Sequence, residues 1–246
     1  IRIPEQGGQI MPYFYFDRTI ILLLPALLLA MWAQANVSRT FGKYSKIYNH
    51  NGYSGADVAR RILDMNGLYQ VKIERVAGNL TDHFDPKSNV VRLSEATYSS
   101  TSVGAIGVAA HEVGHAVQHA VGYTPIKIRN GIVPFVNVCN GLSMPILLIG
   151  VIFAGAGGIF PVLIDVGIIL FSATVLFQLI TLPVEFNASR RALVTLENQN
   201  IMNQEEISGA RAVLKAAALT YVAAALTSIM SLLRLIVLFG GNRRRD

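Results

Sequence analysis

The sequence predicts an α+β membrane protein, with about four transmembrane helices and a small domain of helices and a short β-sheet outside the bilayer. Hydrophobic residues make up 52% of the 246 residues, and the mean hydropathy of +0.44 is too high for an ordinary soluble domain. These apolar residues concentrate in a few long runs. Residues 37–130, between the first and second runs, are instead largely soluble in character.

The N-terminal part of the chain changes character after its first ten residues. Residues 1–10 are polar and rich in glycine, and we expect a leader or a disordered tail there. Residues 19–36 are apolar and predict the first transmembrane helix, with aromatic residues before it and Trp32 near its end, as suits the two bilayer surfaces. A cleaved signal is the alternative, but no clear small-residue cleavage site follows this long run.

The soluble stretch begins with a helix and continues with a small sheet. Ser54, followed three residues later by Asp57, predicts a capped amphipathic helix. Three short segments then predict strands, and the last two flank a turn and therefore form a hairpin. A short helix or turn near residues 94–98 leads into the next helix. The predicted strand segments are residues 71–76, 80–84 and 90–93.

The next helix carries the pattern His-Glu-x-x-His. His111 and His115 lie one turn apart on the same face, so both rings can bind one tetrahedral zinc ion, with Glu112 beside it to take a proton from water. Ser102 can cap this helix. Gly107 lies one turn before His111, which we expect to leave room for a substrate. The alternative is a pair of core or surface histidines on an ordinary helix.

A catalytic zinc ion needs a third protein ligand and an open position. His119 lies about 12 Å from His111 along a straight helix, so we expect it to lie at the surface or to support a ligand. Glu185 is the better candidate, because it follows the third apolar run, where an unpaired carboxylate near hydrocarbon is costly. The alternative role of Glu185 is a salt bridge to Arg190 or Arg191.

Three more segments complete the predicted organisation. Residues 131–182 contain two apolar runs joined by a glycine-rich link and predict a transmembrane hairpin. Residues 183–215 form the segment of the third ligand with further helices. Residues 216–239 predict a fourth transmembrane or interfacial helix.

The distribution of Lys and Arg predicts the side of the membrane on which the site lies. The segment 37–130 holds eleven and the hairpin tip holds none, so the zinc helix and the segment after Leu182 are expected on the cytoplasmic side of the cell membrane. Four spans would place the arginines at 243–245 outside. Either the last run is interfacial or re-entrant, or the tail departs from the rule.

Charge and cysteine content narrow the classes of partner and of metal site. The net charge of +6 suggests a surface that faces anionic lipid. Nucleic acid is a weaker explanation, because the sequence has no basic stripe with interleaved aromatic residues. The single cysteine, Cys139, excludes an intramolecular disulfide and a cysteine-rich zinc site. Any metal ion must therefore be held by histidine and carboxylate ligands.

Several motifs, in order along the chain, resemble the YugP-type membrane zinc metallopeptidases, and the resemblance covers nearly everything from Tyr13 to about Leu238. The layout is more distantly similar to the HtpX and CAAX prenyl proteases, which are also membrane gluzincins. The stretches that carry the resemblance are Gly55–Leu63, Leu80–Pro86, His111–His115, Leu182–Ala192 and Ala217–Leu226.

The resemblance implies a ligand set and a support for it. In these families the third ligand sits in Glu-x-x-x-Asp, and the Asp orients a ligand histidine, so the resemblance implies Glu185 as the ligand. Ser189 stands at the Asp position of this chain. Asn187 or Asp82 are the alternatives that could supply the orienting contact.

These observations predict a zinc metalloendopeptidase that hydrolyses peptide bonds of membrane or membrane-proximal proteins, with one catalytic Zn²⁺ and Glu112 as the base. A strand just before the His-Glu-x-x-His helix is well placed to pair with an extended substrate. The alternative is a small sheet that only supports this helix. Candidate donors to the oxyanion are His83, Tyr221 and Arg190. Their alternative roles are a turn cap, an interfacial anchor, and a pair with Glu185 or with lipid.

Two other functions fit less well. The first is a membrane scaffold or inactive relative that holds membrane-protein partners around a structural zinc site, which would not need an intact Glu112. The second is a transporter, but Asp165 and Arg234 are almost the only ionisable residues in the apolar runs, and no inverted repeat is visible.

Overall fold

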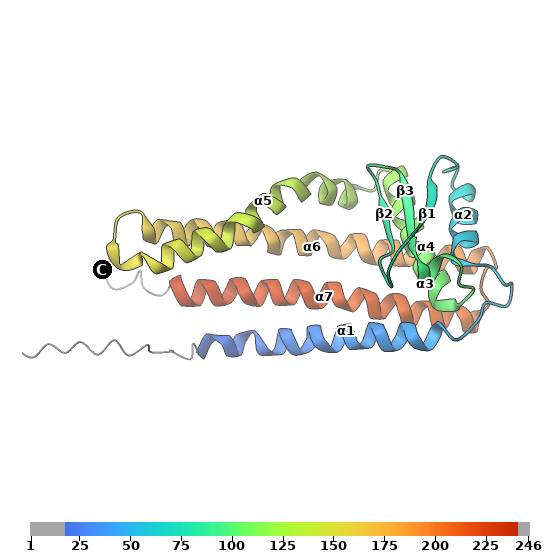
Figure 1. Ribbon diagram of the computed structural model, residues 1–246, viewed down its shortest axis with the longest axis horizontal. Helices are drawn as coiled ribbons and strands as arrows, with labels where there is room; N and C mark the ends of the chain where they lie inside the picture. Colours follow the sequence, from blue (N-terminus) through green and yellow to red (C-terminus); the bar gives the residue numbers. More distant parts are fainter. Residues whose placement is uncertain (1–17, 241–246) are drawn as a thin grey trace, which may run out of the picture.

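Four long helices form the frame of the molecule (Figure 1). The computed structural model describes residues 18–240, and within them these four helices are long and apolar enough to cross a membrane. The expected leader at 1–10 and the arginines at 243–245 lie outside the described residues. The four helices are α1 (Leu24–Tyr44, after the short 3-10 helix η1, Arg18–Leu22), α5 (Thr124–Ile152), α6 (Phe160–Asn198) and α7 (Gln204–Gly240).

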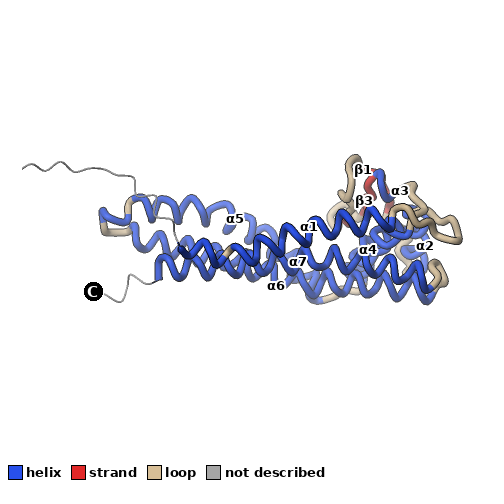
Figure 2. Tube along the Cα trace, turned by 90° about the horizontal axis from the view of Figure 1, so that it is seen from below, coloured by secondary structure: helices blue, strands red, loops and turns tan. Residues whose placement is uncertain are grey.

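The bundle places a small domain at one end only. Helix α1 runs toward this domain and α7 runs back from it, whereas α5 and α6 form a hairpin whose tip, η2 (Ala154–Ala156), lies at the far end (Figure 1). Figure 2 shows the same separation, with the strands confined to one end. Helix α7 is unbroken and packs along α1 and α6.

The small domain consists of short helices around a three-stranded sheet. The sheet has the order β1-β3-β2, with β1 parallel to β3 (Ile73 opposite Val91) and β2 antiparallel to β3 (Phe84 opposite Val91). The predicted α+β membrane fold is therefore confirmed, including the hairpin. The elements of this domain are α2 (Gly55–Met65), β1 (Lys72–Val76), β2 (His83–Asp85), β3 (Val90–Ser94), α3 (Glu95–Tyr98) and α4 (Val103–Ala120).

The order of the strands corrects one expectation. The last strand before α4, the helix with the His-Glu-x-x-His pattern, is β3, and it lies in the centre of the sheet with a neighbour on each side. Its backbone groups are therefore used by β1 and β2, and it has no free edge for a peptide. The edge strand beside α4 is β2, which precedes the hairpin turn.

The core of the small domain is completed by the ends of the membrane helices. Val58 on α2, Leu93 on β3 and Ile106 on α4 are buried together with Leu196 on α6 and Ile207 on α7. Burying such aliphatic side chains contributes about 1.5–3 kcal/mol each. This shared core fixes α4 against α6 and α7, and it thereby sets where the two histidines lie relative to the bundle.

Side-chain caps begin two helices of the small domain where the sequence predicts them. At α2 the Ser54 hydroxyl accepts from the Asp57 backbone N–H at 3.2 Å, and the Asp57 carboxylate accepts from the Ser54 N–H at 2.9 Å. At α4 the Ser102 hydroxyl accepts from the Ala105 N–H at 3.3 Å. Each cap satisfies a backbone donor that the first turn of a helix leaves unpaired.

Two glycines allow α4 to approach its neighbours closely, and one corrects an expectation. A Cβ atom on Gly107 would lie 3.3 Å from the Ala210 side chain of α7, so this glycine serves packing and leaves no room for a substrate. A Cβ atom on Gly114 would lie 2.8 Å from the Ala188 carbonyl oxygen of α6. Gly114 therefore permits the close crossing of α4 and α6 that brings their side chains together.

Candidate active site

The two histidines of α4 point their ring nitrogens at one place. The Nε2 atoms of His111 and His115 are 3.2 Å apart, and their rings meet edge to face with centroids 4.7 Å apart. His115 is buried and His111 is only slightly exposed. The four-residue spacing on a straight helix produces this arrangement, because residues i and i+4 lie one above the other.

Glu185, on α6, completes a cluster of three. Its Oε2 atom lies 3.2 Å from Nε2 of His111 and 3.4 Å from Nε2 of His115. Ligands about 2.0–2.1 Å from a tetrahedral zinc ion are separated by about 3.3–3.4 Å, so these side chains fit three corners of such a site. Among the described residues, this is the group of His, Cys, Asp and Glu side chains whose ligand atoms converge closely enough to hold a metal ion.

The outer nitrogen of His111 is held by α6. Its Nδ1 atom lies 3.1 Å from the Ser189 hydroxyl, one turn after Glu185 on the same helix. A neutral ring that donates from Nδ1 presents the lone pair of Nε2 toward the cluster. Of the residues considered from the sequence for orienting a histidine, Ser189 is the one in contact with His111.

The outer nitrogen of His115 is held by Gln118, which sequence reasoning missed. The Arg191 Nε–H donates to the Asn187 side-chain oxygen at 2.8 Å, and Gln118 Nε2 donates to that same oxygen at 3.0 Å and to the Val184 carbonyl at 2.8 Å. The Gln118 oxygen is then free to accept from Nδ1 of His115, 3.0 Å away. In the neutral ring, Nε2 of His115 must carry a lone pair.

When Nδ1–H of His111 donates to Ser189 and Nδ1–H of His115 donates to Gln118, the cluster is a set of acceptors without a donor among them. The Nε2 lone pairs of His111 and His115 and the carboxylate oxygen of Glu185 face one another within 3.4 Å. Such an arrangement is unfavourable unless a cation lies between the three atoms. The donor set, two imidazoles and one carboxylate, is one that Zn²⁺ accepts in catalytic sites.

Glu185 is also paired with a cation that the sequence did not single out as a partner. Arg129, near the start of α5, donates from Nη1 to Oε1 of Glu185 at 3.2 Å. Arg190 and Arg191, the partners considered from the sequence, do not make this ion pair. No pattern in the sequence indicates this ion pair, because Arg129 lies on α5 and reaches Glu185 only through the packing of α5 against α6.

Glu112 lines a cavity of about 150 Å³ next to the cluster, together with His115 and Glu185. One oxygen of Glu112, Oε2, accepts from the Phe84 backbone N–H of β2 at 3.1 Å. Removal from water raises the pKa of the Glu112 carboxyl to about 7, although the nearby His111 ring opposes the shift. A carboxyl group in this range can accept a proton and return it near neutral pH.

The remaining candidates divide between this cavity and other places. Tyr221 on α7 and His83 on β2 line the cavity, and Nδ1 of His83 lies 2.9 Å from the Thr81 carbonyl oxygen. Asp82 also lines it but accepts from the backbone N–H and hydroxyl of Ser94, at 2.7 and 2.9 Å, and so does not orient a histidine of the cluster.

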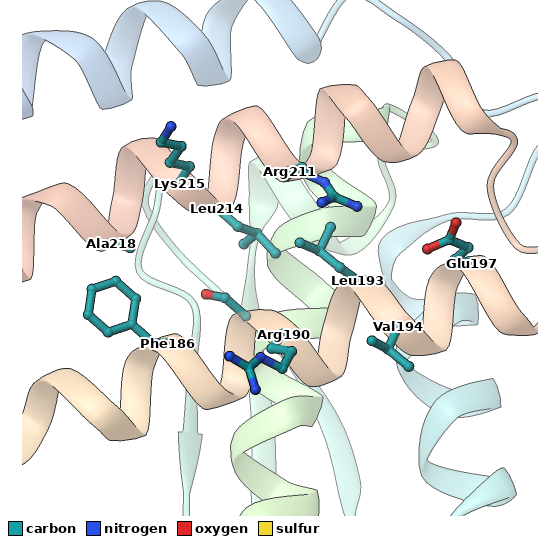
Figure 3. Close-up of a pocket in the computed structure, with 10 residues that line it drawn as sticks. Phe186, Arg190, Leu193, Val194, Glu197, Arg211, Leu214, Lys215 and Ala218 are labelled. Atoms are coloured by element: carbon teal, nitrogen blue, oxygen red, sulfur yellow. The ribbon is translucent and has the colours of Figure 1, made fainter.

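Arg190 and His119 lie elsewhere. Arg190 lines a separate groove between α6 and α7 (Figure 3), which leaves Tyr221 and His83 as the candidate oxyanion donors that line the cavity. His119 is exposed, and its ring packs against Phe84 with centroids 5.8 Å apart. Its surface position agrees with the distance argument from the sequence.

Comparisons with known proteins give one family. The family model described as "Putative neutral zinc metallopeptidase" matches residues 19–240. A curated relative from Bacillus subtilis (strain 168), named "Putative membrane protease YugP", is 51% identical over 224 residues, which cover 91% of this chain and 97% of the relative. No solved structure matches the chain.

Proposed function

The chain belongs to the neutral zinc metallopeptidase family, and from this premise we propose that it is a membrane-embedded zinc metalloendopeptidase. Its substrates would be membrane proteins or proteins at the membrane surface. The observation that carries the proposal is the convergence of His111, His115 and Glu185 at the spacing of a tetrahedral site, beside a cavity lined by Glu112.

We propose that His111, His115 and Glu185 hold one zinc ion and that Ser189 and Gln118 fix the two rings. When bound, zinc would supply a Lewis acid for the scissile carbonyl and for the attacking water. The Arg129 guanidinium beside Glu185 disperses the negative charge of the carboxylate on the side away from the histidines.

The proton transfers would fall to Glu112. Its carboxylate lines the cavity and is held by the Phe84 N–H through one oxygen. The other oxygen can take the proton of a water that attacks the peptide carbonyl and then deliver it to the leaving amine. Tyr221 and His83, the two candidates from the sequence that line the cavity, would be donors to the oxyanion.

The peptide itself would bind along β2. This strand is at an edge of the sheet, and Phe84 donates its N–H toward α4 and Glu112. An extended segment placed beside β2 would therefore run past the cavity with its carbonyl groups near Glu112. The edge offers few main-chain pairs, because β2 has only three residues and the Phe84 N–H is already bonded to Glu112.

The site would face the cytoplasm. The eleven Lys and Arg residues of segment 37–130 lie at the end of the bundle that holds the sheet, and the hairpin tip has none. Ser88→Cys, in the exposed hairpin turn, tests this in a Cys139→Ser background. A membrane-impermeant maleimide should label it in inverted vesicles and not in intact cells, and the reverse result would place the site outside.

The experiment that tests the activity is Glu112→Gln in the purified full chain. Zinc content, measured by mass spectrometry of the metal, should stay at one ion per chain, whereas cleavage of casein and of a membrane-anchored reporter should fall by at least about a hundredfold. Glu95→Gln changes an exposed carboxylate that pairs with Arg75, away from the cavity, and is the matched control that should leave both readouts unchanged. Zinc retained with no cleavage by the wild type would instead favour a scaffold.

A further inference from the structure

A large groove lies between α6 and α7, apart from the cavity that Glu112 lines (Figure 3). Its volume is about 560 Å³. The side chains along it come from one stretch of α6, residues 186–197, and one stretch of α7, residues 211–218. We call it the α6–α7 groove. The proposed peptidase activity uses none of its charged residues.

The floor of the α6–α7 groove is apolar. Leu214 is buried at its base and Leu193 lies beside it. Phe186 and Val194 are each 48% exposed although both are large and hydrophobic. Phe186 and Ala218 lie together at one end of the groove, the end toward the membrane part of the bundle (Figures 1 and 3).

Three cations surround this apolar floor. Arg190 comes from α6, and Arg211 and Lys215 come from α7, and all three are exposed. Within residues 18–240, none of them forms an ion pair with a carboxylate. The lining contains one acidic residue, Glu197, which accepts a hydrogen bond from Gln204 at the opposite end from Phe186. The groove therefore carries a net positive charge, and within residues 18–240 none of its three cations forms an ion pair with Glu197.

The cations lie at the level expected for lipid head groups. The apolar run of α7 ends at Phe239, and from there to Ala218 the helix rises about 32 Å, which matches the roughly 30 Å hydrocarbon core of a bilayer. Lys215 and Arg211 follow within two further turns toward the small domain. Ala218 and Phe186 thus lie near the edge of the hydrocarbon, and the three cations lie just beyond it.

We propose that the α6–α7 groove binds an anionic phospholipid. The phosphate would contact Arg211, whose guanidinium lies between the two helices in Figure 3, while Arg190 and Lys215 on either side would add to the positive potential. An acyl chain would leave the groove past Phe186 and Ala218 into the bilayer. An apolar floor that continues into the membrane together with unpaired cations at head-group level matches the chemistry of such a lipid. An acidic peptide would use the cations but would not need an opening toward the hydrocarbon.

A lipid in this groove would touch the helix that carries the third metal ligand. Ser189 lines the groove and also contacts Nδ1 of His111. The lipid proposal does not depend on peptidase activity, because binding can be measured directly on the chain.

Native mass spectrometry of the delipidated full chain in detergent tests the proposal. We expect dioleoyl phosphatidylglycerol to bind at least about tenfold more tightly than dioleoyl phosphatidylcholine. The combined change Arg190→Gln, Arg211→Gln and Lys215→Gln should remove this preference, since each cation near the membrane surface is worth about a factor of five. Ala218→Phe changes no charge but narrows the apolar end of the groove. It should therefore weaken the binding of phosphatidylglycerol.

The matched control removes three other exposed cations at the same end of the bundle. Two of them lie on α1 and the third follows it. Arg39→Gln, Lys43→Gln and Lys46→Gln together should keep the preference for phosphatidylglycerol. Equal loss in this control, or an unchanged groove triple variant, would overturn the proposal. Displacement of the lipid by millimolar inorganic phosphate, or by an acidic amphipathic peptide at lower concentration, would also overturn it and would point to a soluble anion or to a protein.

Discussion

The candidate active site has two halves that differ in how the chain builds them. The α4 half, with His111, Glu112 and His115, comes from five consecutive residues on one helix. The membrane-helix half, with Glu185 and Arg129, is contributed by α6 and α5. Helix geometry alone fixes the first half, whereas the second exists only because the helices pack in a particular way. The site therefore depends on the crossing of α4 and α6.

We expect the largest effect on the site from removing the carboxylate of the membrane-helix half. Glu185→Ala leaves two imidazoles on an intact helix, and we expect the affinity for zinc to fall by more than about a hundredfold. Zinc titration against a competing chelator measures the change. Glu197→Ala, a carboxylate on the same helix that contacts Gln204, is the matched control. Full zinc affinity in Glu185→Ala would show that the α4 half suffices and would remove Glu185 from the proposed ligand set.

A second test acts on the contact that joins the halves. Gly114→Ala would place a Cβ atom 2.8 Å from the Ala188 carbonyl oxygen, so α4 and α6 must separate. Overpacking of this kind costs about 1–3 kcal/mol, and the separation should weaken zinc binding by roughly tenfold. The measurements are the zinc titration and the thermal unfolding temperature.

Gly107→Ala provides the comparison for the same type of change on the same helix. Its Cβ atom would lie 3.3 Å from a methyl group of Ala210, a contact that a small adjustment relieves. Because alanine also favours the helix by about 1 kcal/mol over glycine, this variant should keep its zinc affinity and its stability. Equal effects of the two variants would contradict the special role of the Gly114 crossing.

The features that could be predicted from the sequence are the local ones, as in the α4 half of the site. The His-Glu-x-x-His helix, its Ser102 cap, the capped helix at Ser54 and the hairpin are local patterns, and the structure contains them. The central position of β3, the pairing of Arg129 with Glu185 and the packing role of Gly107 were not predicted. Each of these depends on residues far apart in the chain, for which one sequence has no periodic signal.

Gln118 is an intermediate case. It lies three residues after His115 on the same helix, so its contact with Nδ1 of that ring was in principle readable from spacing. What the spacing does not show is the orientation of the amide. Asn187 and the Val184 carbonyl, both on α6, take the amide N–H groups and leave the oxygen for the ring.

Each half also supplies one side chain that contacts the outer nitrogen of a histidine ring, and the two contacts can be removed separately. Ser189→Ala removes the partner of His111, and Gln118→Ala removes the partner of His115. Loss of such contacts usually costs about 10–100-fold in metal affinity. We expect Gln118→Ala to cost more, because Gln118 is buried and its loss also leaves the Asn187 and Val184 oxygens without that donor. The chelator titration ranks the two, and no effect from either would contradict the inferred ring orientations.

The smallest expected effect comes from a local feature remote from both halves. Ser54→Ala removes the cap of α2, which should cost about 1 kcal/mol and lower the unfolding temperature by about 2–4 °C without changing zinc affinity. The Ser54 hydroxyl also donates to the Asp57 carboxylate at 2.6 Å and holds the pKa of that carboxyl below its usual value. The stability gained from this bond is present above the unfolded pKa of about 3.9 and is lost as pH falls through the lower folded pKa. The difference in unfolding temperature between wild type and Ser54→Ala should therefore be constant above about pH 5 and should shrink below about pH 4. A difference that grows on acidification would contradict this assignment of the cap.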